Sequence, residues 1–276
     1  MKITVLTDNR PSPVNNSLEV EHGLSFYIET AAEKIMLDVG ASDMFLRNAG
    51  RLGIDIADVD YLVLSHAHND HTGGLKYFLR HNDKAKVYIS SRVDGSRYYS
   101  TRRGGRRDIS IDFSLMREYA DRFVRVTGSM ALTSSARIIG NIPASHILPM
   151  ANRTLLAGDN PDTFDHEMAL LLIDRDLSVL LSSCTHLGLL NTLEACVPVV
   201  PAVFIGGMHL VDSDPGNRFE TEEDYKSISA AISSRYPGLE IYTGHCTGDN
   251  AQAILSRLMP GRFHTFHVGY EWPSHP

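Results

Sequence analysis

The stretch LSHAHNDHTGGL, residues 64–75, places three histidines and one aspartate within the six positions from His66 to His71. An apolar run ends at Leu64 and predicts a strand, while Gly73-Gly74 allows the backbone to turn tightly into a helix. Imidazole binds zinc, nickel and ferrous iron, and a nearby carboxylate binds a second cation or orients a metal-bound water. The stretch therefore predicts a metal site at the end of a strand. The alternative is an exposed polar loop.

Further metal ligands are expected from the second half of the chain, next to other predicted strands. Such residues lie on loops, which is where a sheet presents a site. They are His166, Cys184, His186, His209 and His245. For each histidine alone, the alternative is a hydrogen-bonded core or surface side chain. Because histidines recur next to strands four times, we expect some of them to complete the site.

The composition limits the classes of protein that the chain can represent. Its 276 residues are 43% hydrophobic and 21% charged, as in an ordinary soluble protein. The net charge of −7 argues against a nucleic-acid enzyme, which usually has a basic face. No signal-peptide pattern or membrane-length apolar run is visible, so no membrane partner is expected. Three cysteines, Cys184, Cys196 and Cys246, cannot form a closed set of disulfides, which predicts a reducing, cytoplasmic location.

Short apolar runs of β-type residues recur along the chain, and no linker or repeat divides it. The predicted strands are Ile3–Leu6, Ser25–Ile28, Lys34–Leu37, Tyr61–Leu64, Val87–Ile89, Phe123–Val126, Ala169–Ile173, Val179–Leu181, Val203–Ile205, Leu239–Tyr242 and Arg262–Phe266. The predicted helices are Met44–Leu52, Gly73–Leu79, Asn191–Ala195, Glu222–Ser234, which Thr221 can cap, and Asn250–Met259. Strands in bunches with interspersed helices favour two packed sheets covered by helices, in one domain over residues 1–276.

The pattern His66-x-His68-x-Asp70-His71, with a strand before it and Gly-Gly after it, resembles the metallo-β-lactamase superfamily. The segments SFYIET (residues 25–30) and KIMLDVG (residues 34–40) are similar to the opening hairpin of that superfamily. The resemblance implies an α/β (α+β) fold, namely an αββα sandwich of two mixed β-sheets flanked by helices. It places a metal site at one edge, on loops of both sheets.

Three shorter motifs resemble one branch of this superfamily. They are CTHLGLLN (residues 184–191), GGMHL (residues 206–210) and TGHCTG (residues 243–248). The branch carries the name 7,8-dihydropterin-6-yl-methyl-4-(β-D-ribofuranosyl)aminobenzene 5′-phosphate synthase. That name suggests a pterin-related or aromatic phosphate substrate.

The resemblance also implies roles for individual side chains. His66 and His68 would bind a first metal ion, and Asp70 and His71 a second. The remaining ligands implied are His166, His245 and, at the position of the usual bridging aspartate, Cys184. Cys184 departs from the superfamily pattern, so it is either a thiolate ligand or a small buried side chain, with His186 as the alternative ligand. The cofactor expected is zinc, as two ions, with iron and manganese as alternatives.

A metal site of this kind predicts a metal-dependent hydrolase. A bound metal lowers the pKa of water from about 15.7 to about 7, which provides hydroxide at neutral pH. Asp70 is the candidate general base, and His209 is a candidate for substrate contact or proton transfer. The substrate expected is a small anionic ester, phosphoester or lactone. The alternatives are a mononuclear non-haem iron dioxygenase and a ligand-binding regulatory protein on the same scaffold.

An arginine-rich stretch, RYYSTRRGGRRDIS at residues 97–110, predicts recognition of the anionic substrate. The side chains proposed to bind it are Arg102, Arg103, Arg106 and Arg107. The alternative is a solvated loop or a contact within a homodimer. Asn9 is a further candidate for substrate binding, against a simpler role in a turn before Pro11. Trp272 either covers an aromatic substrate or closes a sheet edge.

Overall fold

The computed structural model describes residues 1–212 and 218–273, and the chain forms two compact units. Unit 1 comprises Met1–Tyr98, Asp108–Thr127 and Phe266–Pro276, and unit 2 comprises Tyr99–Arg107 and Gly128–Thr265. Each unit contains a large mixed β-sheet with flanking helices, so the predicted fold class is confirmed. The prediction of one domain over residues 1–276 stays a prediction.

The sheet of unit 1 has the order β18-β1-β2-β3-β4-β5-β8. Its strands are β1 (Lys2–Thr7), β2 (Ser25–Glu29), β3 (Lys34–Leu37), β4 (Tyr61–Val63), β5 (Lys86–Ser90), β8 (Phe123–Val126) and β18 (Glu271–Trp272). The predicted hairpin of β2 and β3 is present, and β3, β4, β5 and β8 run parallel. Leu37 is paired with Val63, so β3 and β4 end at the same edge of the sheet. The residues after Leu37 and Val63 therefore begin side by side.

The helices of unit 1 include two that continue the histidine stretch. They are α1 (Met44–Arg51), η1 (Ile56–Asp58), α2 (Asn69–Thr72), α3 (Leu75–His81), α4 (Phe113–Glu118) and η2 (Ala120–Arg122). The helix expected to begin at Gly73 begins at Leu75, and Gly73-Gly74 separates it from α2. A Cβ on Gly73 would lie 2.2 Å from the carbonyl oxygen of Ala41, so only glycine allows this close approach.

The sheet of unit 2 has the order β17-β16-β15-β14-β13-β10-β9. Its strands are β9 (Met130–Ala131), β10 (Ala136–Ile139), β13 (Ala169–Asp174), β14 (Leu177–Ser182), β15 (Val203–Gly206), β16 (Glu240–Thr243) and β17 (Phe263–Thr265). β13 and β14 form a hairpin, and β14 to β17 run parallel. Ser182, Gly206 and Thr243 are in register, so β14, β15 and β16 also end at one edge.

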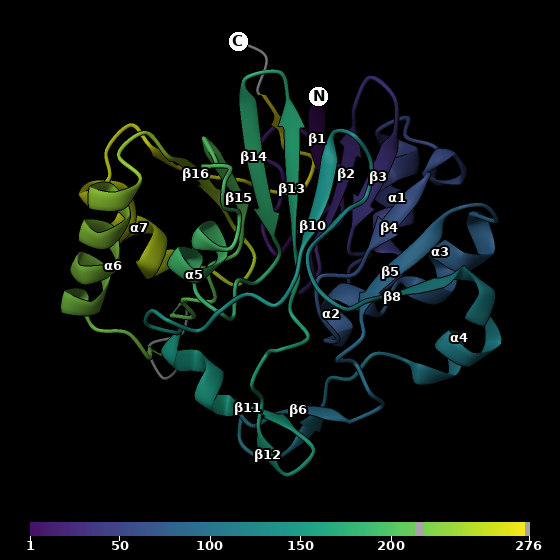
Figure 1. The fold of residues 1–276 in the computed structure, drawn as a ribbon, viewed down its shortest axis with the longest axis horizontal. Helices are drawn as coiled ribbons and strands as arrows, with labels where there is room; N and C mark the ends of the chain where they lie inside the picture. Colours follow the sequence, from purple (N-terminus) through teal and green to yellow (C-terminus); the bar gives the residue numbers. More distant parts are fainter. Residues whose placement is uncertain (213–217, 274–276) are drawn as a thin grey trace. The chain divides into compact units, whose positions relative to one another are not determined.

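Helices α5 (Leu189–Glu194), α6 (Glu222–Arg235) and α7 (Asp249–Leu258) lie beside this parallel part of the sheet of unit 2 (Figure 1). A small sheet, in the order β12-β11-β6-β7, carries the arginine-rich loop between its last two strands. Its strands are β6 (Tyr98–Ser100), β7 (Arg107–Asp108), β11 (Leu155–Ala157) and β12 (Asn160–Pro161), and the short helix η3 (Met150–Thr154) precedes β11.

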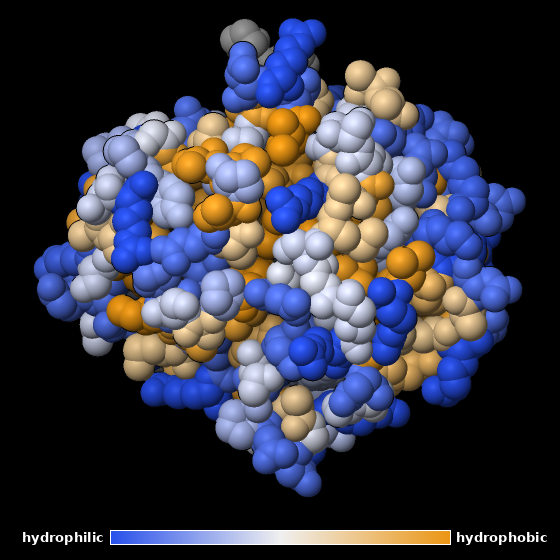
Figure 2. Space-filling model, in the orientation of Figure 1, coloured by the Kyte–Doolittle hydropathy of each residue, from blue (hydrophilic) through white to orange (hydrophobic). Residues whose placement is uncertain are grey.

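The surface and the edges of the structure bear on several expectations. Hydrophilic side chains prevail on the face drawn in Figure 2, and hydrophobic ones are interspersed among them in small groups. Trp272 is buried in β18, which pairs with β1 at the sheet edge, as expected for a side chain that closes an edge. The three cysteines are buried, and none of them forms a disulfide. Among the described residues, no helix has both the length and the apolar character that crossing a membrane requires.

Candidate functional site

In unit 1, the histidine stretch forms a buried cluster at the carboxyl end of β4. His66 and His71 are fully buried, and His68 is 3% exposed. The ring centre of His66 lies 4.6 Å from that of His68 and 4.3 Å from that of His71. The structure therefore brings together the three histidines that the sequence predicts as ligands.

Asp38, which follows β3, fixes this cluster from the neighbouring strand. Its carboxylate accepts hydrogen bonds from the backbone N–H and the hydroxyl of Ser65, at 2.7 and 2.6 Å. Its Oδ2 also lies 2.9 Å from Nδ1 of His71. Because an ionised carboxylate only accepts, Nδ1 of His71 carries a hydrogen, and in the neutral ring Nε2 is then the nitrogen with a lone pair. Asp38 thus orients His71 for binding a cation through Nε2.

Asp70 lies on the Nε2 side of His71. Its Oδ2 is 3.4 Å from that nitrogen and 3.5 Å from Nε2 of His22, a histidine that sequence reasoning missed. Nδ1 of His22 is 3.2 Å from Nδ2 of Asn9, so Asn9 lies close to this cluster. Asp8 also accepts a hydrogen bond from the backbone N–H of Arg10. This bond closes a turn around Asn9, as expected from the alternative role of Asn9 in a turn before Pro11.

The electrostatics of this cluster favour a cation. Burial alone would lower the pKa of His71, but the charge of Asp70 and the hydrogen bond to Asp38 outweigh it and raise the pKa to about 10. A proton is thus held strongly between two carboxylates. Buried imidazoles beside carboxylates are also the donors that a divalent transition metal prefers, so the residues present fit the metal that the resemblance implies.

In unit 2, the candidate ligands follow the parallel strands, at the edge where those strands end together. Cys184 and His186 follow β14, His209 follows β15 and His245 follows β16. All four are buried. Ligands in open parallel sheets bind at the carboxyl ends of strands, so the register of these strands explains why the sequence pattern recurs.

The backbone at this edge is held in unusual conformations. Thr185, His209 and His245 have φ values of +56°, +50° and +51°, in the left-handed region that ordinary residues avoid. A Cβ on Gly206, at the end of β15, would lie 1.8 Å from the carbonyl oxygen of Ser182. Backbone strain of this kind gathers at functional sites, where the surrounding structure maintains it.

His186 is positioned from both its backbone and its ring. The ring is stacked on Phe164, with ring centres 4.3 Å apart and planes 9° apart, and Nδ1 lies 3.1 Å from Oδ1 of Asn152. Glu167, which sequence reasoning missed, accepts the backbone N–H groups of His186 and Leu187 at 2.7 and 2.8 Å. Burial of Glu167 raises its pKa to about 7, although the two backbone bonds oppose this rise.

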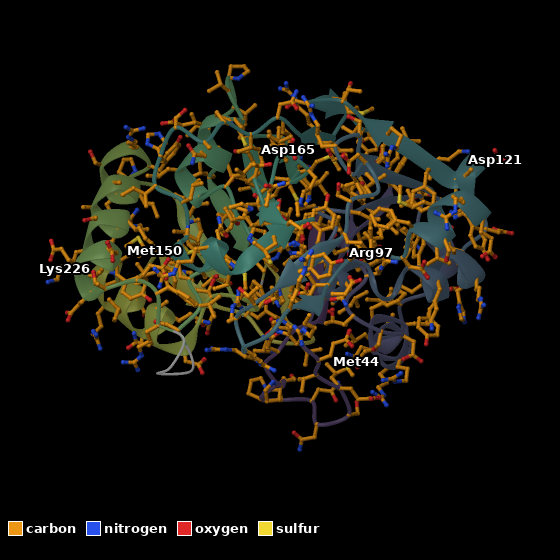
Figure 3. The ribbon with its side chains drawn as sticks, turned by 90° about the horizontal axis from the view of Figure 1, so that it is seen from below. Met44, Arg97, Asp121, Met150, Asp165 and Lys226 are labelled. Atoms are coloured by element: carbon orange, nitrogen blue, oxygen red, sulfur yellow. The ribbon has the colours of Figure 1, made fainter. Side chains whose placement is uncertain are left out.

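His166 has a carboxylate partner that sequence reasoning also missed. Nε2 of His166 lies 3.3 Å from Oδ2 of Asp162, and both side chains are almost fully buried. Phe164 between them has a φ of +54°, so the loop before β13 is tightly turned. The neighbouring Asp165, labelled in Figure 3, is exposed.

Cys184 and His209 lie in one group with Cys246. Their potential ligand atoms lie within 4.8 Å of one another, and all three residues are buried. The ring of His209 is also 4.1 Å from that of His186. Within unit 2, the structure therefore brings together three of the predicted residues, and sulfur and imidazole donors suit zinc.

The arginine-rich loop contributes one side chain to this group. A terminal nitrogen of Arg102 lies 3.2 Å from Nε2 of His209. Arg106 instead pairs with Asp159 at 2.5 Å and lies 3.7 Å from the ring centre of Tyr99, while Arg103 and Arg107 are exposed. The structure thus distinguishes Arg102 from the other three predicted substrate ligands.

The chain is similar to metallo-β-lactamases both in part of its sequence and in its fold. Residues 18–127 match the metallo-β-lactamase superfamily, and the predicted recognition of that superfamily is confirmed. The fold matches Tm1679, described as a metal-dependent hydrolase of the β-lactamase superfamily, with a TM-score of 0.79 and 24% identity over 100% of both chains.

Two relatives from Methanocaldococcus jannaschii are similar over most of their length. One is 7,8-dihydropterin-6-methyl-4-(β-D-ribofuranosyl)-aminobenzene-5′-phosphate synthase, 23% identical over 92% of this chain and 90% of its own. The other is an uncharacterized protein, 27% identical over 97% of this chain and 98% of its own. The first of these names agrees with the branch that the short motifs resemble.

Proposed function

We propose that this protein is a metal-dependent hydrolase that acts on a small anionic ester, phosphoester or lactone. The observation that carries the proposal is the buried cluster of His66, His68 and His71, oriented by Asp38 and flanked by Asp70. Potential ligand atoms of Asp38, His66 and His71 lie within 4.8 Å of one another, and a metal ion held there would make bound water acidic enough for hydrolysis.

Each unit has its own group of proposed ligands, and the cofactor proposed is zinc, as two ions. In unit 1 they are His66, His68, Asp70 and His71; in unit 2 they are His166, Cys184, His186 and His245. Bound zinc would supply a Lewis acid that polarises the scissile bond and makes water more acidic.

The protein side chains then have separate roles. Asp38 accepts the hydrogen on Nδ1 of His71, so Nε2 is the nitrogen that would face a metal ion, and Asp70 accepts a proton from water as general base. Arg102 holds the anionic group of the substrate through charge-assisted hydrogen bonds. Because a guanidinium only donates, Nε2 of His209 accepts from Arg102, and the neutral ring carries its hydrogen on Nδ1. His209 therefore presents Nδ1–H as a hydrogen-bond donor to an oxygen of the substrate.

A second candidate is a synthase, favoured by the name of one relative. Such an activity would join an aromatic amine that bears a ribose phosphate to a dihydropterin whose 6-methyl carbon carries a leaving group. The new C–N bond would replace the bond to that leaving group, the nitrogen would lose one proton, and the ribose phosphate would again face Arg102. Incubating the metal-loaded protein with both compounds, followed by mass spectrometry, would detect the joined product.

The test of the hydrolase begins with metal analysis of the purified protein, followed by turnover of phosphodiester, phosphomonoester, carboxylic ester and lactone substrates. We expect bound zinc and hydrolysis of an anionic member of this panel. His66→Ala with His71→Ala should remove both. His81→Ala is the matched control, because this exposed histidine bonds only its own helix, through Tyr77.

Arg102→Ala tests the substrate side of the proposal. Loss of a hydrogen bond to a charged group is worth about 1.5–3 kcal/mol, so KM for the anionic substrate should rise by about one to two orders of magnitude. Arg257→Ala, on the exposed side of α7, should leave KM unchanged. Bound iron with oxygen uptake and no hydrolysis would refute the hydrolase.

A further inference from the structure

Unit 2 contains a cavity that none of the candidate metal ligands lines. It has a volume of about 180 Å³ and lies between the segment that leads into η3, the start of α5 and one face of α6. Its apolar wall includes Ile147, Met150, Leu189, Met208, Ile228 and Ile232. Figure 3 shows Met150 on the side of unit 2 where α6 lies, while Lys226 of α6 points outward.

Glu220 is the buried polar side chain in this apolar wall. It is 8% exposed, and its Oε1 accepts a hydrogen bond of 2.6 Å from the backbone N–H of Met150. Its second oxygen, Oε2, is buried and has no hydrogen-bond partner among the described residues. A buried polar atom of this kind is costly unless something bonds to it, so the cavity contains a built acceptor.

The charges around the cavity are complementary to a cation. In the described part of the chain, no lysine or arginine lines it. His146 at its rim already pairs with Glu194, at 2.8 Å. Asp224 also lines the cavity, but its Oδ2 is engaged by the backbone and hydroxyl of Thr221. Burial raises the pKa of Glu220, and the charges of Asp224 and Asp212 add to this rise.

We propose that this cavity is a binding site for a small apolar amine, whose ammonium group donates to Oε2 of Glu220. The apolar body of the ligand would lie among the side chains of η3, α5 and α6. A cavity of about 150 Å³ holds a benzene molecule, so this one accepts a single ring or a short aliphatic chain together with the ammonium group. The site is distinct from the metal clusters, and its occupation does not rest on the proposed hydrolase activity.

The experiment compares three ligands of one shape with different charge. Benzylamine, benzyl alcohol and benzoate are titrated into the metal-loaded full-length protein, and binding is followed by calorimetry and by ligand-observed NMR. We expect benzylamine to bind at least tenfold more tightly than benzyl alcohol and benzoate not to bind. Equal binding of all three, or binding of none, would overturn the proposal.

Two variants assign the binding to this cavity. In Glu220→Gln, the amide oxygen still accepts from Met150, but the amide nitrogen replaces the second oxygen and is a donor. The variant should therefore bind benzylamine and benzyl alcohol about equally. Ala231→Phe fills the cavity from α6 and should abolish binding of both ligands. Ala230→Phe places the same side chain on the exposed side of α6 and should bind like the native protein.

Further controls distinguish loss of the amine site from unfolding of the variants and from effects of the metal site. Near-ultraviolet circular dichroism of each variant checks that its fold is native. Native benzylamine affinity in a folded Ala231→Phe variant, or a retained amine preference in folded Glu220→Gln, would refute the site. His66→Ala should leave benzylamine binding unchanged, even though it removes metal.

Discussion

Asp38 shows how a side chain that need not touch a metal can determine a metal site. It bonds Ser65 twice and His71 once, and its own φ of +60° aims the carboxylate back over the end of β4. Carboxylates behind metal-binding histidines fix the tautomer and the orientation of the ring. The proposed site therefore depends on Asp38 as much as on its ligands.

Replacing this carboxylate should weaken metal binding without removing a ligand. In Asp38→Asn, the amide presents a donor to Ser65 or His71, both of which also donate. We expect the dissociation constant for zinc, measured by competition with a chromogenic chelator, to rise by about 10- to 100-fold. Asp121→Asn, an exposed aspartate of the same unit labelled in Figure 3, is the control. An unchanged constant in a folded Asp38→Asn protein would contradict the role given to Asp38.

Glu167 should make the stability of the metal-free protein depend on pH. Its pKa is about 7 in the folded state, raised mainly by burial, against an ordinary value of 4.5. Between these values the folded state holds a proton that the unfolded state has lost. The free energy of unfolding should therefore fall as pH rises through this window, by about 3 kcal/mol, and then remain level above pH 7.

The variant Glu167→Gln should remove that slope, because its side chain does not titrate. Urea denaturation at several pH values measures both proteins. The variant should also have a free energy of unfolding about 1–3 kcal/mol lower at low pH. Its amide NH₂ is a donor and faces a backbone N–H of His186 or Leu187, which is also a donor, so one hydrogen bond is lost. Asp165→Asn, which changes an exposed neighbour, should keep the native slope. If the free energy of unfolding of Glu167→Gln still fell as pH rises, a group other than Glu167 would be responsible for the pH dependence.

The sequence predicts residues of the site well where they are contiguous or follow strands. His66, His68 and His71 are recognisable because they share one loop, and the later histidines because each lies next to a strand. The position of Asp38 beside these histidines depends on the pairing of Leu37 with Val63, and no local pattern reveals that pairing. Arg102 and Arg106 look alike in the sequence, and only the fold shows that Arg106 is engaged by Asp159, 53 positions away.

At the scale of elements, the accuracy of prediction follows the strength of the apolar pattern. The predicted bounds of β3 and β8 are those observed, and the hairpins of β2–β3 and β13–β14 are present. Helix α4 escaped prediction because none of its residues is buried, which leaves no amphipathic period. The short strands of the small sheet escaped because they are only two or three residues long and depend on their partners.

Helix α6 begins at Thr221, the predicted capping residue, which forms a capping box with Asp224. The hydroxyl of Thr221 accepts from the backbone N–H of Asp224 at 3.2 Å, and the carboxylate of Asp224 accepts from the backbone N–H of Thr221 at 2.7 Å. Thr221→Ala should lower the free energy of unfolding by about 1 kcal/mol, measured by urea denaturation. Ser234→Ala, at the exposed far end of α6, should change it by less than about 0.5 kcal/mol. Equal effects of both changes would argue against the cap.

At the scale of the whole molecule, the two units share one design. In each, parallel strands of a mixed sheet end in register, and the chain places buried histidines on the loops that follow. The end of a strand fixes where each loop begins, while buried carboxylates such as Asp38 and Glu167 fix how the loop turns. A fold built this way tolerates many substrates, because the scaffold positions the ligands and the loops determine what binds.

Removing metal should therefore destabilise the molecule as a whole. An ion that binds only the folded state adds about 4 kcal/mol when its concentration is a thousandfold above its Kd. For a chain of this size, that stabilisation corresponds to a rise in Tm of roughly 10 °C. A strong chelator should lower the Tm of the purified protein by about this amount in calorimetry, and added zinc should restore it. The double variant His66→Ala, His71→Ala should melt at the lower temperature with or without chelator. If the chelator lowered its Tm as much as that of the native protein, the stabilising ion would lie outside the histidine cluster, and the metal centre proposed for unit 1 would be wrong.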